Sequence, residues 1–329
     1  MVTNMPQTEN EKLTLRLDAI RYEAESINSY EFSSLKGKAL PGFSPGSHIE
    51  IHLDNGMSRS YSLLNSPSEK NRYVIAVARD ENGRGGSKYF HDTAQVGKSY
   101  SVGRPKNNFP LVVGAKASVF IAGGIGITPV WSMAQYLNEI GEPWKIYYRA
   151  RAIEFAALLK SDFYKLNAER IHVVFDAELS LRGIEREAFI ESIVSQEGSF
   201  SHYYCCGPNG MLEAFKSATK GLATDHVHFE YFSPLEEAAR EGGFSVILNR
   251  KNITISVAAG QSILDALLAN NIEIANSCRE GVCGACEVGV LCGTPDHRDS
   301  ILSEAERKSG KTMFVCCSGA HSKSLTLDI

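Results

Sequence analysis

The chain has 329 residues, of which 43% are hydrophobic and 22% are charged, and its formal net charge is -4. This length suffices for two or three domains that each bury a core, so a single small module is excluded. The composition is that of a globular protein, and the slightly acidic balance argues against nucleic acid as a partner.

The sequence predicts neither a membrane span nor a secreted protein. No stretch approaches the roughly 20 apolar residues that cross a bilayer, and the polar opening MVTNMPQTENEK lacks the apolar centre of a signal peptide. We therefore expect a disordered N-terminus over residues 1–11, no membrane contact and a cytoplasmic location. Most of the eight cysteines lie between Cys278 and Cys317, which favours metal ligation over disulfides.

Residues 12–112 are predicted to form an antiparallel β-barrel. Short stretches in which apolar and polar residues alternate are separated by Gly, Pro and Asn, as in Ser47–Leu53, Arg59–Leu64 and Tyr73–Arg79. Alternation with a period of two is typical of strands that bury one face.

Residues 113–232 are predicted to form an α/β domain with a parallel sheet. The apolar run Ser118–Ala122 is followed by a glycine turn and a helical stretch, and strand-like and helical stretches alternate after it. Such alternation is typical of βαβ units. The further predicted strands are Trp144–Arg149, His172–Phe175 and His202–Cys206, and the predicted helices are Pro129–Ile140, Glu185–Ile193 and Met211–Thr219.

A polar segment, 233–243, ends in two glycines and suits an interdomain linker. Residues 244–329 are then predicted to form a third, cysteine-rich domain. Its predicted strands are Phe244–Leu248, Ile253–Val257, Cys286–Leu291 and Leu325–Ile329, and its predicted helix is Ser262–Ala269.

The cysteines of the third domain have the spacing of a plant-type 2Fe-2S cluster, Cys278-x4-Cys283-x2-Cys286 with a fourth cysteine about thirty residues on. Gly281, Gly284 and Ala285 leave room for backbone amides to approach the cluster sulfurs. A structural zinc site is the alternative, but zinc ribbons usually pair two short C-x2-C knuckles.

The fourth ligand is either Cys316 or Cys317, because adjacent residues on a strand face opposite sides and only one can reach the irons. Cys292 has no partner at ligand spacing and follows an alternating strand. We therefore expect Cys292 to be a small buried or half-buried hydrophobe.

Two loops of the α/β domain are candidates for nucleotide binding. The turn Gly123-Gly124-Ile125-Gly126 lies between a buried strand and a helix, where amides favour a phosphate, although a tight connection alone also needs glycine. Cys206-Gly207-Pro208 follows another strand, at the end where open α/β sheets bind ligands. Cys206 is thus placed to face a nicotinamide; a buried cysteine before an ordinary turn is the alternative.

Two segments of the barrel are candidates for holding a flavin. In the alternating strand that contains Arg59 and Tyr61, these side chains share a face and offer a cation beside an aromatic ring. The turn Arg84-Gly85-Gly86-Ser87 offers amides and a hydroxyl to a phosphate. Each segment alone also fits an ordinary surface or turn.

These motifs together resemble the phthalate dioxygenase reductase family, which includes vanillate demethylase and carnitine monooxygenase reductases. The resemblance rests on RSYS at 59–62, GRGGS at 83–87, GGIGITP at 123–129, CGP at 206–208 and the cysteine loop, in the same order. It implies a multidomain chain with an antiparallel FMN-binding β-barrel, an NADH-binding α/β domain and a C-terminal α+β ferredoxin domain of the β-grasp type.

The resemblance also implies roles for single residues. Phe232 corresponds to an aromatic residue that packs near the flavin, with Tyr231 as its nearest rival, and Cys316 begins a V-C-x-S ending in which the first cysteine binds iron. Ser62 and Cys206 are the expected catalytic positions. The expected FMN-binding residues are Arg59, Ser60, Tyr61, Ser62, Gly85, Gly86 and Ser87, the expected NADH-binding residues are Gly123, Gly124, Ile125, Thr128, Cys206, Gly207 and Pro208, and the expected iron ligands are Cys278, Cys283, Cys286 and Cys316.

The function implied is that of the reductase component of a multicomponent Rieske-type oxygenase. NADH would give a hydride to FMN, and single electrons would pass through the cluster to the oxygenase, so alignment is the protein's task. A reductase for a non-Rieske acceptor, such as a diiron oxygenase, is one alternative. A non-enzymatic module that senses redox state or binds zinc is the other.

Three further features bear on this prediction. Gly319 stands where relatives commonly have arginine. Arg149 and Arg151 follow a strand near the expected ribose site, so an arginine there could accept the 2′-phosphate of NADPH. The segment Asp296–Asp299 is expected to be a surface turn, although it resembles a family segment near the cluster that would contact the partner or support the ligand loop.

Overall fold

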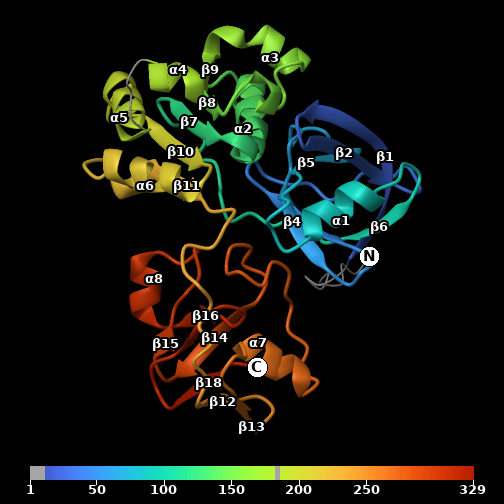
Figure 1. Cartoon of the computed structure of the whole chain (residues 1–329), viewed down its shortest axis with the longest axis vertical. Coiled ribbons are helices and arrows are strands. Elements are labelled where there is room, and N and C mark those ends of the chain that lie inside the picture. Colours follow the sequence, from blue (N-terminus) through green and yellow to red (C-terminus); the bar gives the residue numbers. More distant parts are fainter. Residues whose placement is uncertain (1–11, 182–185) are drawn as a thin grey trace, which may run out of the picture. The chain divides into compact units, whose positions relative to one another are not determined.

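The computed structural model describes residues 12–181 and 186–329, so the predicted disordered segment 1–11 and the predicted helix start at Glu185 lie outside the described residues. The chain divides into two compact units, Met1–Glu230 and Tyr231–Ile329. Figure 1 shows a barrel and an α/β domain in the first unit, and a smaller sheet with short helices in the second.

The barrel is a six-stranded sheet with the order β4-β3-β6-β1-β2-β5, and all its strand pairs are antiparallel. A bridge between Leu63 and Ile75 joins its first and last strands, and the inward side chains form one apolar cluster. The predicted barrel is confirmed. Its elements are β1 (Leu13–Ala24), β2 (Ile27–Ser34), β3 (His48–His52), β4 (Ser58–Ser62), β5 (Arg72–Ala78), α1 (Gly86–Thr93) and β6 (Ser99–Val102).

The α/β domain has a five-stranded parallel sheet with the order β11-β10-β7-β8-β9. Since β7 comes first in the chain, the strand order reverses between β7 and β10, which makes their carboxyl ends a topological switch point. The strands are β7 (Ser118–Gly123), β8 (Trp144–Ala150), β9 (Ile171–Phe175), β10 (His202–Cys206) and β11 (Val227–Glu230).

The helices of this domain connect the parallel strands, as the alternation in the sequence predicts. Helix α2 begins two residues before the predicted Pro129 and ends where Gly141, with a φ of 76°, leaves the right-handed region. The helices are η1 (Gly124–Gly126), α2 (Ile127–Ile140), η2 (Ile153–Phe155), α3 (Asp162–Leu166), η3 (Ala168–Arg170), α4 (Asp176–Leu181), α5 (Arg186–Glu197), α6 (Asn209–Ala218) and η4 (Thr224–His226).

Helix α2 also fastens the α/β domain to the barrel. Ser132 Oγ donates to the carbonyl of Asn65 at 2.8 Å, and Gln135 Nε2 donates to the carbonyl of Leu64 at 2.7 Å. Two side chains on one face of α2 thus form hydrogen bonds to the barrel backbone just beyond β4. These bonds fix the position of β4 relative to α2.

The second unit has a five-stranded sheet with the order β13-β12-β18-β14-β16, in which only β12 and β18 run parallel. A capping box between Ser262 and Asp265 begins its helix α7. The elements are β12 (Phe244–Leu248), β13 (Ile253–Val257), α7 (Ile263–Ala269), β14 (Glu287–Cys292), β15 (Pro295–Asp296), α8 (Glu304–Ser309), β16 (Thr312–Phe314), β17 (Gly319–Ala320) and β18 (Ser324–Leu327).

Cys292 is exposed, so the prediction that it is a small buried or half-buried hydrophobe is wrong. The physical reason is a shift of register between Val290 and Cys292, where β14 pairs with β18. A bulge of this kind turns side chains away from the face that strict alternation assigns.

No helix in the described ranges is long and apolar enough to span a membrane.

The loops at the switch point touch each other through their backbones. A Cβ added to Gly126 would overlap the carbonyl of Cys206, and one added to Gly123 would lie 2.8 Å from Cδ of Pro208. Gly123, which ends β7, and Gly126, which precedes α2, are therefore needed for packing against the end of β10 and the loop after it. Gly124 differs, because its φ is +53° and nothing lies within 4 Å of its missing Cβ.

Gly126→Ala should destabilise the first unit by roughly 2–3 kcal/mol, because the backbone of Cys206 cannot move without disturbing β10. The matched control is Gly221→Ala, where nothing lies within 4 Å of the added Cβ. Urea denaturation of both variants measures the difference. Equal midpoints would show that the two loops do not depend on this close approach.

Candidate functional site

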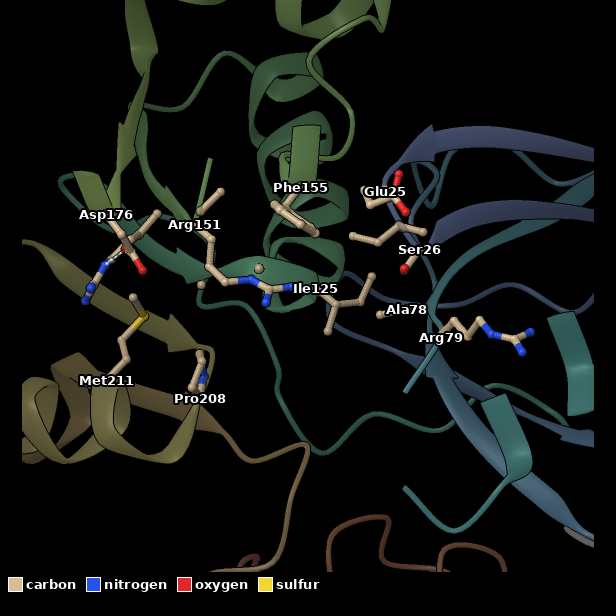
Figure 2. Close-up of a pocket in the computed structure, with 15 residues that line it drawn as sticks. Glu25, Ser26, Ala78, Arg79, Ile125, Arg151, Phe155, Asp176, Pro208 and Met211 are labelled. Atoms are coloured by element: carbon tan, nitrogen blue, oxygen red, sulfur yellow. Dashed lines mark hydrogen bonds and ion pairs between the residues drawn. The ribbon is translucent and has the colours of Figure 1, made fainter. Parts of the chain in front are cut away.

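A pocket of about 290 Å³ lies between the barrel and the carboxyl edge of the parallel sheet. Figure 2 shows Glu25, Ser26, Ala78 and Arg79 reaching it from the barrel, and Ile125, Arg151, Phe155, Asp176, Pro208 and Met211 from the other side. A backbone bond from the amide of Glu25 to the carbonyl of Glu154, at 2.6 Å, links the two sides nearby. The pocket is therefore built by two domains and includes the switch point.

The glycine turn contributes open backbone to this pocket. Gly123, Gly124 and Ile125 line it, and neither η1 nor α2 has a side chain that caps its first amides. Thr128 lies in the first turn of α2, and its hydroxyl donates to the carbonyl of Ile125 at 3.0 Å. In this arrangement Thr128 supports the turn from behind, while Gly124 leaves space for an anionic group near the helix amides.

Charged side chains line the part of the pocket beyond the glycine turn. Arg149 Nε lies 2.6 Å from Oδ1 of Asp176, which directly follows β9. Arg151 lies over the ring of Phe155, at 4.2 Å from its centroid. The charge of Arg149 is therefore compensated within the protein, which lowers its attraction for an additional phosphate. Asp176 was not predicted as a site residue, although an acid just after a predicted strand marks the same sheet edge.

Cys206 ends β10 as a completely buried residue and pairs with Glu230 of β11. Burial, Glu230 and Cys205 raise the pKa of the Cys206 thiol, so it remains protonated. Burial also raises the pKa of Glu230 to about 8, and its buried Oε2 atom has no hydrogen-bond partner among the described residues. Two neutral protonated groups thus lie side by side at the strand end, and Glu230 is a second residue that the sequence analysis missed.

The two predicted flavin segments meet in the barrel. A Cβ added to Gly86, the first residue of α1, would overlap the guanidinium of Arg59. Arg59 Nη2 also donates to the carbonyl of Arg84 at 3.3 Å. The strand RSYS and the turn GRGGS therefore form one cationic corner, which neither motif could indicate by itself.

Tyr61 gives this corner an aromatic wall. Its ring stacks on Phe90 of α1 at a centroid distance of 6.1 Å, and burial raises the pKa of its hydroxyl. Tyr61 Oη is buried without a hydrogen-bond partner in the described part of the chain, which suits a contact to a bound polar group.

The remaining predicted flavin residues lie beside this corner. Ser60 and Ser62 pair with Glu50 and His48 in β3. Gly85 caps α1 with a left-handed φ of 77°. Ser87 Oγ accepts the amide of Asp80 at 3.1 Å, so it stabilises the turn.

Phe232 is half-buried and follows β11 by two residues. It belongs to the second unit together with the buried Tyr231. The flavin role of either ring therefore stays a prediction.

The four predicted iron ligands are all buried in the second unit. The amide of Cys278 donates to Cys283 Sγ at 3.4 Å, and the amide of Glu280 donates to Cys278 Sγ at 3.3 Å. The neighbouring thiols of Cys278 and Cys316, together with burial, raise the pKa values of Cys283 and Cys286. Buried thiols that cannot ionise side by side become good thiolate donors once cations are present, so this set fits an iron–sulfur cluster.

Cys316 and Cys317 have different surroundings. Cys316 contacts the thiols of Cys278 and Cys286. Cys317 Sγ lies 3.7 Å from the carbonyl of Phe314 and faces Gly281 instead. This geometry supports Cys316 as the fourth ligand and gives Cys317 a packing role behind the ligand loop.

The segment Asp296–Asp299 is not a surface turn, because Asp299 is only 1% exposed. Asp299 Oδ2 accepts the amides of Ile301 and Leu302 at 3.1 and 2.8 Å. The amide of Ser300 donates to the carbonyl of Gly281 at 2.9 Å. Burial here reflects support of the ligand loop, which is the second of the two roles expected from the sequence.

Within residues 12–181 and 186–329, no three His, Cys, Asp or Glu side chains are arranged to hold a single metal ion. A 2Fe-2S cluster does not need such a group, because its four thiolates are shared between two irons.

Known proteins match the chain along its length. Residues 120–217 match the model of an oxidoreductase NAD-binding domain, and residues 246–321 match that of a 2Fe-2S iron-sulfur cluster binding domain. The phenoxybenzoate dioxygenase subunit beta of Ectopseudomonas oleovorans is 46% identical over 317 residues, 96% of this chain and 97% of that protein. The tetrachlorobenzoquinone reductase of Sphingobium chlorophenolicum is 44% identical over 311 residues, 93% of this chain and 94% of that protein.

A solved structure of phthalate dioxygenase reductase decides the family. It superposes with a TM-score of 0.73 at 36% identity, over 97% of this chain and 98% of that one. The chain belongs to the phthalate dioxygenase reductase family. It is an NADH-dependent oxidoreductase whose cofactors are FMN, NADH and a 2Fe-2S cluster, as the family resemblance implied.

The reductase should prefer NADH because Asp176 compensates Arg149. Asp176→Asn should raise the ratio of kcat/KM for NADPH to that for NADH about fivefold, since a partly exposed ion pair is worth roughly 1 kcal/mol. Steady-state reduction of cytochrome c with each nucleotide measures this ratio. Asp162→Asn, which breaks an exposed pair with Lys165 outside the pocket, should leave it unchanged; an equal shift in both variants would contradict the role of Asp176.

Glu230 should make the first unit less stable as the pH rises. The pKa of Glu230 is about 8 in the folded chain and near 4.5 when unfolded, so the folded state binds the extra proton between these values. Stability should therefore fall from about pH 5 to pH 8. With these two pKa values the decline comes to roughly 3–4 kcal/mol, and Glu230→Gln should remove it.

Thermal unfolding at several pH values, with the exposed Glu169→Gln as control, measures the Glu230 effect. If Glu230→Gln and the parent chain lose stability in parallel between pH 5 and pH 8, the carboxyl is already ionised in the folded protein.

Proposed function

We propose that this chain is the reductase component of a Rieske-type oxygenase system, which takes electrons from NADH and delivers them through FMN and the 2Fe-2S cluster. The observation that supports this most is the presence of two sites in one chain. A nucleotide pocket is bordered by a barrel with a cationic corner, and four buried cysteines gather in a separate domain. Similarity to phthalate dioxygenase reductase along nearly the whole chain points the same way.

When bound, FMN would supply the exchange of a two-electron hydride for single electrons, and a 2Fe-2S cluster would supply one-electron transfer. The barrel's task is to hold and orient the flavin. Arg59, pressed against Gly86, offers a guanidinium to its phosphate, and Tyr61 offers a ring face and a hydroxyl that has no protein partner among the described residues.

The α/β domain orients the nucleotide. Gly124 leaves backbone amides open for the pyrophosphate, and Asp176 lies where it can accept hydrogen bonds from ribose hydroxyls. Cys206 and Glu230 end neighbouring strands as protonated groups. They provide an uncharged, water-poor surface for the nicotinamide, with no buried charge that would oppose the transfer.

The third domain holds the cluster through Cys278, Cys283, Cys286 and Cys316. Amides in the ligand loop donate to sulfur atoms of Cys283 and Cys278, and such bonds would favour the reduced form of a bound cluster. We place the flavin barrel at residues 12–112, the nucleotide domain at 113–232 and the cluster domain at 244–329, in the cytoplasm.

The acceptor is proposed from the names of relatives. The phenoxybenzoate and phthalate proteins are components of dioxygenases, whereas the tetrachlorobenzoquinone reductase is named for a quinone. A quinone acceptor is therefore the second candidate. A diiron oxygenase or a non-enzymatic module has no such relative among the proteins compared above.

Reduction of three acceptors distinguishes these functions: a Rieske oxygenase, a diiron oxygenase component and tetrachlorobenzoquinone, each supplied with NADH. We expect the Rieske centre to be reduced fastest. Cys316→Ser should lower this rate at least about a hundredfold, because loss of an iron ligand removes the cluster. Cys317→Ser is the matched control and should keep the cluster's electron paramagnetic resonance signal and most of the rate.

If the quinone is reduced faster than the Rieske centre and this reaction persists in Cys316→Ser, quinone reduction is the function, because a two-electron acceptor does not need the cluster. Loss of the signal in Cys317→Ser with retention in Cys316→Ser would reverse the assignment of the fourth ligand.

A further inference from the structure

The segment between the two sheets, residues 235–243, is bound along the surface of the second unit. The sequence predicts an interdomain linker here, and its polar composition suggests a free one. In the structure it makes backbone and side-chain contacts over most of its length. We call residues 235–243 the strap.

The first half of the strap lies on the segment that supports the ligand loop. The amide of Leu235 donates to Ser300 Oγ at 3.1 Å. The carboxylate of Glu236 lies 3.5 Å from Arg298 and 4.0 Å from Arg307. Arg307 in turn donates to the carbonyl of Asp299. The ion pairs of Glu236 therefore hold the strap against the residues that support the ligand loop.

The middle of the strap is held beside the proposed fourth ligand. The amide of Ala239 donates to the carbonyl of Cys317 at 2.8 Å. The side chain of Ala239 is 7% exposed and lies 2.8 Å from where a Cβ on Gly319 would be. A side chain at position 319 would therefore displace Ala239.

The end of the strap is bonded to helix α7 and to β13. Arg240 Nη1 lies 3.1 Å from Asp265 Oδ2, and its carbonyl accepts the amide of Gly260 at 2.7 Å. The amide of Gly243 donates to Val257 at 2.9 Å. The strap is thus attached at its beginning, its middle and its end.

This attachment shortens the connection between the two units. With the strap bound, at most five peptide steps lie between Glu230, the last residue of β11, and Leu235, where the strap begins, and they span at most about 18 Å. With the strap released, fourteen steps would lead to Phe244, at most about 50 Å. Effective concentration falls roughly as the −3/2 power of tether length, which gives about a fivefold difference.

We propose that the strap is a positioning element that keeps the cluster domain within short reach of the flavin, with Glu236 and Ala239 as its positioning residues. This inference rests on the proposed function, because it concerns electron transfer from the flavin to the cluster. It assigns no contact between the two units; it concerns the length of chain that joins them.

The first test lengthens the connection and leaves the strap intact. A Gly-Ser insertion of about ten residues between Pro234 and Leu235 should slow transfer from flavin to cluster about fivefold in anaerobic stopped-flow experiments with NADH. The same insertion between Lys251 and Asn252, in the turn that joins β12 to β13, is the matched control and should have no effect. Equal rates in the two insertion variants would overturn the proposal.

The second test releases the strap. Glu236→Gln combined with Ala239→Asp should accelerate amide hydrogen exchange in residues 235–241 and slow the same transfer step about fivefold. Glu237→Gln is the control, because Glu237, unlike Glu236, forms no ion pair with the described residues. NADH bleaching of the flavin and the cluster's resonance signal after dithionite should stay as in the parent chain.

These readouts separate the two hypotheses. If the parent chain shows no flavin bleaching or no cluster signal, the proposed function fails. If both are present but the released strap leaves the transfer rate unchanged, the positioning role fails. If releasing the strap abolishes the cluster signal, the strap is needed to bind the cluster and the reach argument is wrong.

Discussion

The close approach of two backbone loops at the edge of the parallel sheet is the constraint on which the nucleotide site depends. Gly126 touches the carbonyl of Cys206, and Gly123 touches Pro208, because no side chain separates them. Contact between these loops fixes the start of α2, and α2 bonds the barrel backbone through Ser132. One packing requirement thus places the open amides of the glycine turn, Pro208 and the barrel around one pocket.

The second unit keeps four thiols close together in a buried place. Left-handed backbone at Arg279, Gly281 and Gly284 turns the loop tightly, and Asp299 and Cys317 support it from behind. The strap lies on the same supporting residues. Ligand geometry and the length of the interdomain connection are therefore coupled through one set of contacts.

Much of this organisation could be predicted from the sequence, because cysteine spacing, glycine turns and strand alternation are local signals. Contacts between distant segments could not, and they decide the roles of Asp176, Glu230 and Ala239. A single acid at a strand end has no spacing that marks it, and the burial of Asp299 depends on a loop some twenty residues away in the sequence. The exposure of Cys292 likewise follows from a bulge, which the alternation of apolar and polar residues does not reveal.

An anaerobic titration of the purified chain with NADH, followed by absorbance, tests whether electrons pass from the nucleotide to the cluster within one chain. We expect that the flavin bleaches first, that the cluster bleaches in the same chain without dithionite, and that more than one NADH per chain is consumed. FMN should be the flavin released on denaturation. If NADH bleaches neither chromophore, or reduces the flavin while the cluster stays oxidised, the proposed path from nucleotide to cluster is contradicted.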